Sequence, residues 1–185
     1  MPRTVTGINY IAIRDWIRAL FWSSLFVFFL TGYICKGFKI EGGSMNPLLH
    51  HGDFVLADKL TARWSGYHRQ DIVVFQNPAE PGMQLIKRIL AEPGDMVEIR
   101  SGDVYINGTR QAEAYVIPEF RSAETIRPTR VPRGFYFVAG DHRTNSNDSR
   151  VWALAHEVYP FVPERCIEGR IIFRFWPVQA IGTVQ

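Results

Sequence analysis

Cysteine is scarce in this sequence, and its scarcity limits the kind of scaffold that the chain can form. Cys35 and Cys166 are its two cysteines, which excludes a disulfide-rich scaffold and a four-cysteine zinc site. We expect both thiols to be unpaired. Disordered and low-complexity classes are also excluded, because 46% of the residues are hydrophobic and 14% are aromatic. The 185 residues fit one ordinary domain with a small additional segment.

The sequence also lacks an excess of basic charge beyond its N-terminal segment. The net charge is +3, but residues 1–36 carry four basic residues and one acidic residue, which leaves seventeen of each sign in the remainder. A nucleic-acid-binding face needs a surplus of lysine and arginine to neutralise phosphates. We therefore expect no nucleic-acid partner.

Charge is absent altogether from residues 19–35. As a helix these 17 residues span roughly 25 Å, and an extension back to Trp16 approaches the roughly 30 Å core of a bilayer. We predict an N-terminal segment with a single transmembrane anchor over residues 1–36 and one domain over residues 37–185. A cleaved secretory signal and a buried soluble helix are the alternatives.

Beyond Lys39 the sequence shows no long helical period and no internal repeat. Short apolar runs lie between turn signals instead, which predicts a mainly β domain. Asn107-Gly108 is a strong hairpin signal. We interpret residues 110–133, which are polar and interrupted by prolines, as an excursion outside the core. The runs that we expect to form strands are residues 54–57, 72–75, 96–99, 104–106, 135–139 and 171–176.

A first candidate for chemistry is Ser44, which follows Gly42-Gly43 and precedes Pro47. Glycines let the backbone approach a ligand closely, and proline stiffens the end of the segment. A serine here can be a nucleophile if a neighbouring group takes its proton. The alternative is a flexible hinge that ends in a turn.

A second candidate is Lys87, in an apolar run over residues 85–90. In a strand, alternation places Leu85, Lys87 and Ile89 on one face. Burial among apolar neighbours lowers the pKa of a lysine, and a general base near neutral pH needs a fall of about 3 units. The alternative is an exposed lysine on a strand edge.

A third candidate is the segment of residues 140–150, which is dense in short polar side chains. Such side chains hydrogen-bond to nearby backbone, so we predict a structured loop. Asp148 and Arg150 are spaced to form an ion pair. A solvated turn is the alternative.

In this order the three segments resemble a known family. Ser-Met-x-Pro, then Lys-Arg, then Gly-Asp-x-x-x-x-Ser-x-Asp-Ser-Arg, all after a hydrophobic N-terminal helix, is similar to type I signal peptidase, the Ser/Lys protease family that removes secretory signal peptides. Pro93-Gly94-Asp95 and the closing segment of residues 173–177 extend the resemblance over nearly the whole chain beyond residue 36. The resemblance implies a compact signal-peptidase-like β domain that needs no metal and no cofactor.

Roles carried over from the family fall on matching positions of this chain. Ser44 resembles the nucleophile, and Lys87 resembles the base that takes its proton and returns it to the leaving amine. Ser146 matches a serine that orients the lysine nitrogen. Met45 matches the residue beside the nucleophile that helps to shape the substrate groove.

Three charged positions match structural residues of the family near the site. Asp148 and Arg150 match a pair that stiffens the loop near the lysine, and Asp141 matches another such position. The resemblance also implies a location, the cytoplasmic (inner) membrane of a bacterium, crossed once, with the catalytic domain on the outer, periplasmic face. The implied partners are preprotein signal peptides and the lipid bilayer.

The chain departs from the family pattern at several positions. Gly42 stands where some members carry a serine whose hydroxyl is a second oxyanion donor, and His142 stands where asparagine is usual. The resemblance as a whole implies a membrane-anchored serine endopeptidase that removes N-terminal signal peptides from exported preproteins through a Ser/Lys dyad and an acyl-enzyme. The departures add, as an alternative within the family, a specialised branch that matures a pilin-like precursor in conjugative transfer. A non-catalytic, anchored peptide-binding β domain is the alternative of a different class, and the joint presence of Ser44 and Lys87 argues against it.

Overall fold

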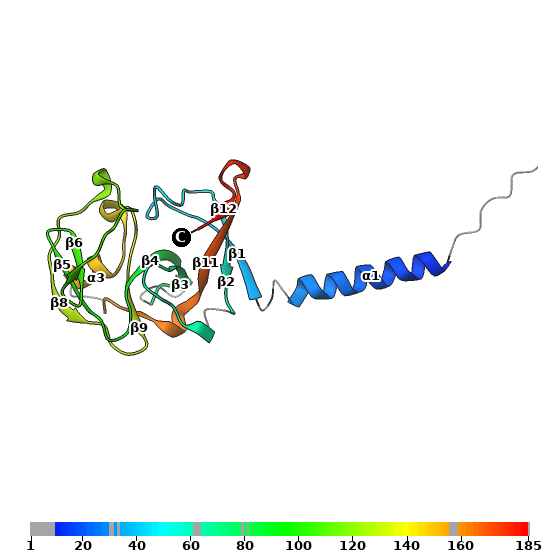
Figure 1. Cartoon of the computed structure of the whole chain (residues 1–185), viewed down its shortest axis with the longest axis horizontal. Coiled ribbons are helices and arrows are strands. Elements are labelled where there is room, and N and C mark those ends of the chain that lie inside the picture. Colours follow the sequence, from blue (N-terminus) through cyan, green and yellow to red (C-terminus); the bar gives the residue numbers. More distant parts are fainter. Residues whose placement is uncertain are drawn as a thin grey trace, which may run out of the picture.

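The computed structural model describes residues 10–29, 32, 34–60, 64–78, 80, 82–155 and 159–184. Helix α1 (Tyr10–Phe29) lies apart from the β domain in Figure 1, and its described side chains are almost all exposed. Within the described ranges, no helix is long and apolar enough to cross a membrane. Leu30, Thr31 and Tyr33, which belong to the predicted anchor, lie outside the described residues.

The rest of the described chain is mainly β, as predicted. Its short helices are η2 (Pro118–Phe120), η3 (Arg143–Asn145), α3 (Ser149–Ala155), η4 (Glu164–Cys166) and η5 (Val178–Ala180). Its strands are β1 (Cys35–Lys39), β2 (Phe54–Asp58), β3 (Ile72–Gln76), β4 (Gln84–Ala91), β5 (Met96–Arg100), β6 (Asp103–Ile106), β7 (Thr109–Arg110), β8 (Ile126–Arg130), β9 (Phe135–Ala139), β10 (Val162–Pro163), β11 (Ile167–Trp176) and β12 (Gly182–Thr183).

Two antiparallel sheets form the β domain (Figure 1). The larger has the strand order β1-β2-β11-β3-β4-β9-β10, with β12 paired to β11, and the smaller has the order β7-β6-β5-β8. In the larger sheet β3 carries four consecutive buried residues, because both of its faces are covered. Strand β4 lies between β3 and β9, so Lys87 lies on an inner strand of the larger sheet.

Every apolar run predicted to be a strand lies within a strand of the structure. The hairpin at Asn107-Gly108 is also confirmed, because β6 pairs with β7 and both turn residues have positive φ, 52° and 81°. Strand β11 begins at Ile167, four residues before the predicted run. Both cysteines are free thiols, as expected.

The segment of residues 110–133 differs from the expected excursion outside the core. Strand β8 pairs with β5 and completes the smaller sheet. Ile126 and Val131 are buried in the same apolar cluster as Val97 and Phe137. The polar composition of the segment concealed this, since β8 lies at a sheet edge and only its inward side chains need to be apolar.

Candidate active site

Ser44 lies in a turn that packs on the core of the larger sheet. The Asn46 N–H donates to the Gly43 carbonyl at 3.1 Å, and the Leu49 N–H donates to the Met45 carbonyl at 2.9 Å. Met45 and Leu49 are buried in one apolar cluster. Burial of these two residues therefore fixes the main chain directly after Ser44.

The chain that follows β9 approaches this turn closely. The His142 N–H donates to the Ser44 carbonyl at 3.0 Å. A Cβ atom on Gly140 would lie 2.5 Å from that carbonyl oxygen and 2.3 Å from Ser146 Oγ. Side chains cannot occupy such positions, so the approach requires glycine at residue 140.

Lys87 reaches Ser44 from β4. Its side chain is buried, with 3% of the residue exposed. The Lys87 Nζ donates to Ser44 Oγ at 2.8 Å and to the Ile86 carbonyl at 3.1 Å. The structure thus brings together the two predicted dyad residues, which are 43 positions apart in the sequence.

The surroundings of Lys87 favour its neutral form. Burial lowers the pKa of Lys87 from 10.5 to about 8, and the charge of Arg150 adds to the lowering. Asp148 and Asp141 oppose it, because their carboxylates favour the ammonium form. Burial is the largest of these effects, so an appreciable fraction of the amine is neutral near pH 8.

Ser146 lies near the dyad, but its hydroxyl is directed elsewhere. It donates to Asp148 Oδ2 at 2.6 Å. Within the described part of the chain, the hydrogen-bond partners of Lys87 Nζ are Ser44 Oγ and the Ile86 carbonyl. An ionised carboxylate is the stronger acceptor for a hydroxyl proton, which explains why Ser146 bonds Asp148.

Asp148 holds the loop of residues 140–150 together. The predicted ion pair with Arg150 is present, with Nη2 to Oδ2 at 2.8 Å and Nε to Oδ1 at 3.0 Å. The carboxylate also accepts from the Gly140 N–H at 2.9 Å and from the Arg150 N–H at 3.1 Å. Asp148 and Arg150 are both buried, and the Arg150 guanidinium is compensated by Asp148 together with Glu124.

We expect Asp148→Asn to destabilise the fold by up to about 3–5 kcal/mol, because it leaves the buried Arg150 with Glu124 as its remaining counter-charge. Urea unfolding would measure the loss. Asp103→Asn is the matched control, since Asp103 pairs with Arg110 and Arg121 at the surface and should change the unfolding midpoint little. A midpoint for Asp148→Asn equal to that of the control would contradict the prediction.

Asp141 has a partner that the sequence analysis missed. Arg88 donates to both of its carboxylate oxygens, at 2.9 and 2.8 Å, and to the Gln70 carbonyl at 3.0 Å. Arg88 and Asp141 are both buried. A signal was present, because alternation places Arg88 on the opposite face of β4 from Lys87, and an arginine in a buried strand requires a carboxylate.

A groove of about 720 Å³ opens beside the dyad. Its walls come from β1 with the serine turn and from the first half of β4 with the segment before it, and they include Ser44, Met45 and Lys87. Met45 is 2% exposed and lines this groove. Three of the predicted site residues, Ser44, Met45 and Lys87, therefore line one cavity.

Gly42, which lines the groove, has a left-handed backbone with φ of +87°. Its N–H donates to His51 Nδ1 at 3.2 Å. A serine at this position would have free space around its Cβ but a strained backbone. Some family members carry a serine at this position. In this chain the backbone conformation at residue 42 favours glycine instead.

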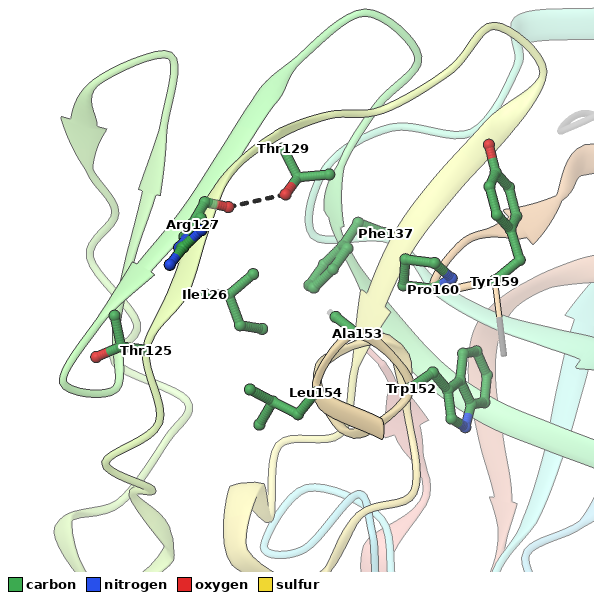
Figure 2. A pocket seen from close by; sticks show the side chains of 10 residues that line it. All are labelled: Thr125, Ile126, Arg127, Thr129, Phe137, Trp152, Ala153, Leu154, Tyr159 and Pro160. Atoms are coloured by element: carbon green, nitrogen blue, oxygen red, sulfur yellow. Dashed lines mark hydrogen bonds between the residues drawn. The ribbon is translucent and has the colours of Figure 1, made fainter. Parts of the chain in front are cut away.

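A second cavity, of about 700 Å³, contains neither dyad residue. Figure 2 shows Trp152, Ala153 and Leu154 of α3 on one side of it and residues of β8 on the other, with Phe137 between them. Among the described residues that line it, the hydroxyl groups are those of Thr125, Thr129 and Tyr159, and neither a histidine nor a lysine is present to take their protons.

Comparisons with known proteins place the chain in a family. A family model described as "Signal peptidase, peptidase S26" matches residues 13–176. A "Probable signal peptidase I-1" of Synechocystis is 32% identical over 181 residues, 93% of this chain and 87% of that protein. "Signal peptidase I" of Bacillus licheniformis is 32% identical over 179 residues, 92% of each chain.

A solved structure of a signal peptidase I from Enterococcus faecalis is 30% identical, with a TM-score of 0.48 over 57% of this chain and 97% of that one. The family match covers most of the chain and includes both segments of the dyad. The chain therefore belongs to the signal peptidase family, peptidase S26.

Proposed function

We propose that Ser44 and Lys87 are the nucleophile and the general base of this serine endopeptidase, which removes signal peptides from preproteins. The observation that carries the assignment is the 2.8 Å separation of Lys87 Nζ and Ser44 Oγ. That distance allows direct proton transfer, and burial of the amine supplies the neutral form that can accept the proton.

The reaction begins when neutral Lys87 takes the Ser44 proton and Ser44 Oγ attacks the scissile carbonyl. The oxygen of the tetrahedral intermediate accepts a hydrogen bond from the Ser44 N–H. Collapse breaks the C–N bond, and the Lys87 ammonium gives its proton to the leaving amine. The neutral Lys87 amine then takes a proton from water, which hydrolyses the acyl-enzyme and restores the Ser44 hydroxyl.

The substrate binds as an extended strand in the groove. Strand β1 is at the edge of the larger sheet, and β9 pairs with β4 only from Arg88 onward, so residues 84–87 have one side open among the described strands. Main-chain hydrogen bonds to these two edges hold the peptide, and the groove lined by Met45 accepts its small alternate side chains.

The N-terminal segment, residues 1–36, is the membrane anchor in this proposal, and residues 37–185 form the catalytic domain. The support is the uncharged stretch of residues 19–35, together with the exposed apolar side chains of α1, among them Trp22 and Phe26. A single crossing places the catalytic domain at the lipid bilayer on the outer face of the cytoplasmic membrane, where exported preproteins arrive.

The experiment is incubation of the full chain in detergent with a panel of secretory preproteins and pilin-like precursors, followed by mass mapping of the products. We expect one cut in each accepted precursor, directly after a small residue. The matched control is the same precursor with a bulky residue in place of that small one, which should not be cut. Absence of any cut, or cuts scattered without regard to side-chain size, would contradict the proposal.

A further inference from the structure

Residues 113–124, here called the strap, cover the loop that follows β9. Three residues of that loop, His142, Arg143 and Arg150, each contact a side chain of the strap. The His142 ring stacks on Phe120 with centroids 3.7 Å apart. Arg150 donates to Glu124 at 2.5 Å. The third contact, between Arg143 and Glu113, is the most buried and is considered next.

Glu113 is the junction of this strap. Arg143 Nη2 donates to Glu113 Oε1 at 2.6 Å and Nη1 donates to Oε2 at 3.2 Å. The two side chains are 3% and 8% exposed. The Tyr115 hydroxyl also donates to Glu113 Oε1, at 2.9 Å. Burial, followed by the charge of Glu113, raises the pKa of Tyr115, so this hydroxyl keeps the proton that it donates.

Tyr115 extends the junction to the strand of the base. The guanidinium carbon of Arg88 lies 4.1 Å from the centroid of the Tyr115 ring. Arg88 follows Lys87 directly in β4 and holds Asp141 through two hydrogen bonds. Glu113 therefore contacts the loop near the serine through Arg143 and β4 through Tyr115.

Arg143 is tied to the main chain around the nucleophile. Its Nε donates to the Gly140 carbonyl at 2.9 Å. Gly140 is the residue with no room for a side chain between Ser44 and Ser146, and the nearby His142 N–H holds the Ser44 carbonyl. A shift of the Arg143 guanidinium thus moves the main chain that supports the nucleophile.

We propose that Glu113 is a positioning residue for cleavage, which fixes the Lys87–Ser44 geometry by holding Arg143 directly and Arg88 through Tyr115. The proposal rests on the dyad assigned above. Glu113 does not line the groove, so it acts through these contacts and not on the substrate. A single carboxylate from the strap thereby links the two segments that carry the reacting groups.

The test compares Glu113→Gln with Glu119→Gln. Glu119 is exposed in the same strap, so its exchange is the matched control. We expect Glu113→Gln to lower kcat roughly tenfold or more, with KM changed less than about twofold, because small displacements of reacting groups reduce the chemical step. Glu119→Gln should match wild type in both constants.

The pH dependence of kcat/KM separates positioning from simple loss of folded protein. Glu113 pairs with Arg143 and makes no direct contact with Lys87 among the described residues, so we expect its exchange to change the pKa of the amine through water entry. A loosened site admits water and moves the acid limb of the profile upward by roughly half a unit or more. Partial unfolding lowers kcat/KM by the same factor at every pH and leaves the apparent pKa of the acid limb unchanged.

Tyr115→Phe keeps the ring against Arg88 and removes only the hydroxyl that donates a hydrogen bond to Glu113. We expect a kcat loss of roughly threefold with a loss of stability of about 1–3 kcal/mol that leaves the protein folded at assay temperature. This variant decides the matter if Glu113→Gln does not fold. Wild-type kcat and an unmoved acid limb in a folded Glu113→Gln protein, or wild-type kcat in Tyr115→Phe, would overturn the positioning role. Inactive wild-type enzyme would instead count against the dyad, which keeps the two failures distinct.

Discussion

Ser44→Ala is expected to abolish cleavage while leaving the fold intact. The hydroxyl is the atom that attacks the scissile carbonyl, and its hydrogen-bond partner in the structure is Lys87 Nζ. The acyl-enzyme cannot form without it, so kcat should fall by a factor on the order of 10⁴ or more. Turnover of a preprotein in detergent measures the activity, and thermal unfolding followed by circular dichroism measures the fold.

Ser23→Ala is the matched control for this exchange. Ser23 lies on the exposed surface of α1, where its hydroxyl donates to the Leu20 carbonyl at 3.0 Å. The same loss of one hydroxyl there should leave turnover unchanged. Full activity in a folded Ser44→Ala protein would remove Ser44 from the role of nucleophile, whatever the behaviour of other residues.

The dyad could be expected from the sequence because each member has a local signature. Two glycines before Ser44 and a proline after it favour a backbone that approaches a ligand closely and ends stiffly, and apolar neighbours on a strand favour burial of Lys87. Neither signature is specific alone. The order of the segments made them specific, and the structure then placed Nζ and Oγ within hydrogen-bonding distance.

Other contacts of the site have no local signature. Glu113 and Arg143 are 30 positions apart, and nothing in the polar segment around Glu113 distinguishes it from the exposed Glu119. Their pairing depends on how the smaller sheet brings the strap over the loop after β9. The burial of Ile126 was hidden for a similar reason, since one inward side chain on an edge strand is too weak a pattern to predict.

The second large effect is expected from Lys87→Met, which removes the amine at nearly constant volume. Without a base, Ser44 keeps its proton, and kcat should fall on the order of 10³-fold or more. Lys87→Arg should be nearly as inactive, because a guanidinium does not deprotonate at working pH. Retained turnover in either variant would exclude Lys87 as the base.

Lys87→Met should also stabilise the folded protein in a pH-dependent way. The pKa of Lys87 is about 8 in the folded chain, below its ordinary value of 10.5. Between these two values the unfolded chain binds more protons, so Lys87 lowers stability progressively as pH falls from 10.5 to 8. Below pH 8 the loss of unfolding free energy caused by Lys87 reaches its full value, about 3 kcal/mol. Above pH 10.5 it vanishes, because the amine is neutral in both states.

Urea unfolding at several pH values measures this effect. Loss of the hydrogen bonds to Ser44 and the Ile86 carbonyl offsets part of the gain, so we expect Lys87→Met to be more stable by roughly 2 kcal/mol at pH 7, with the difference fading toward high pH. Lys39→Met, the same exchange at an exposed position of β1, should change stability little at any pH. Equal stability of wild type and Lys87→Met at pH 7 would mean that the amine is not desolvated. A solvated ammonium next to Ser44 could not take its proton, so the same result would also weaken the catalytic assignment.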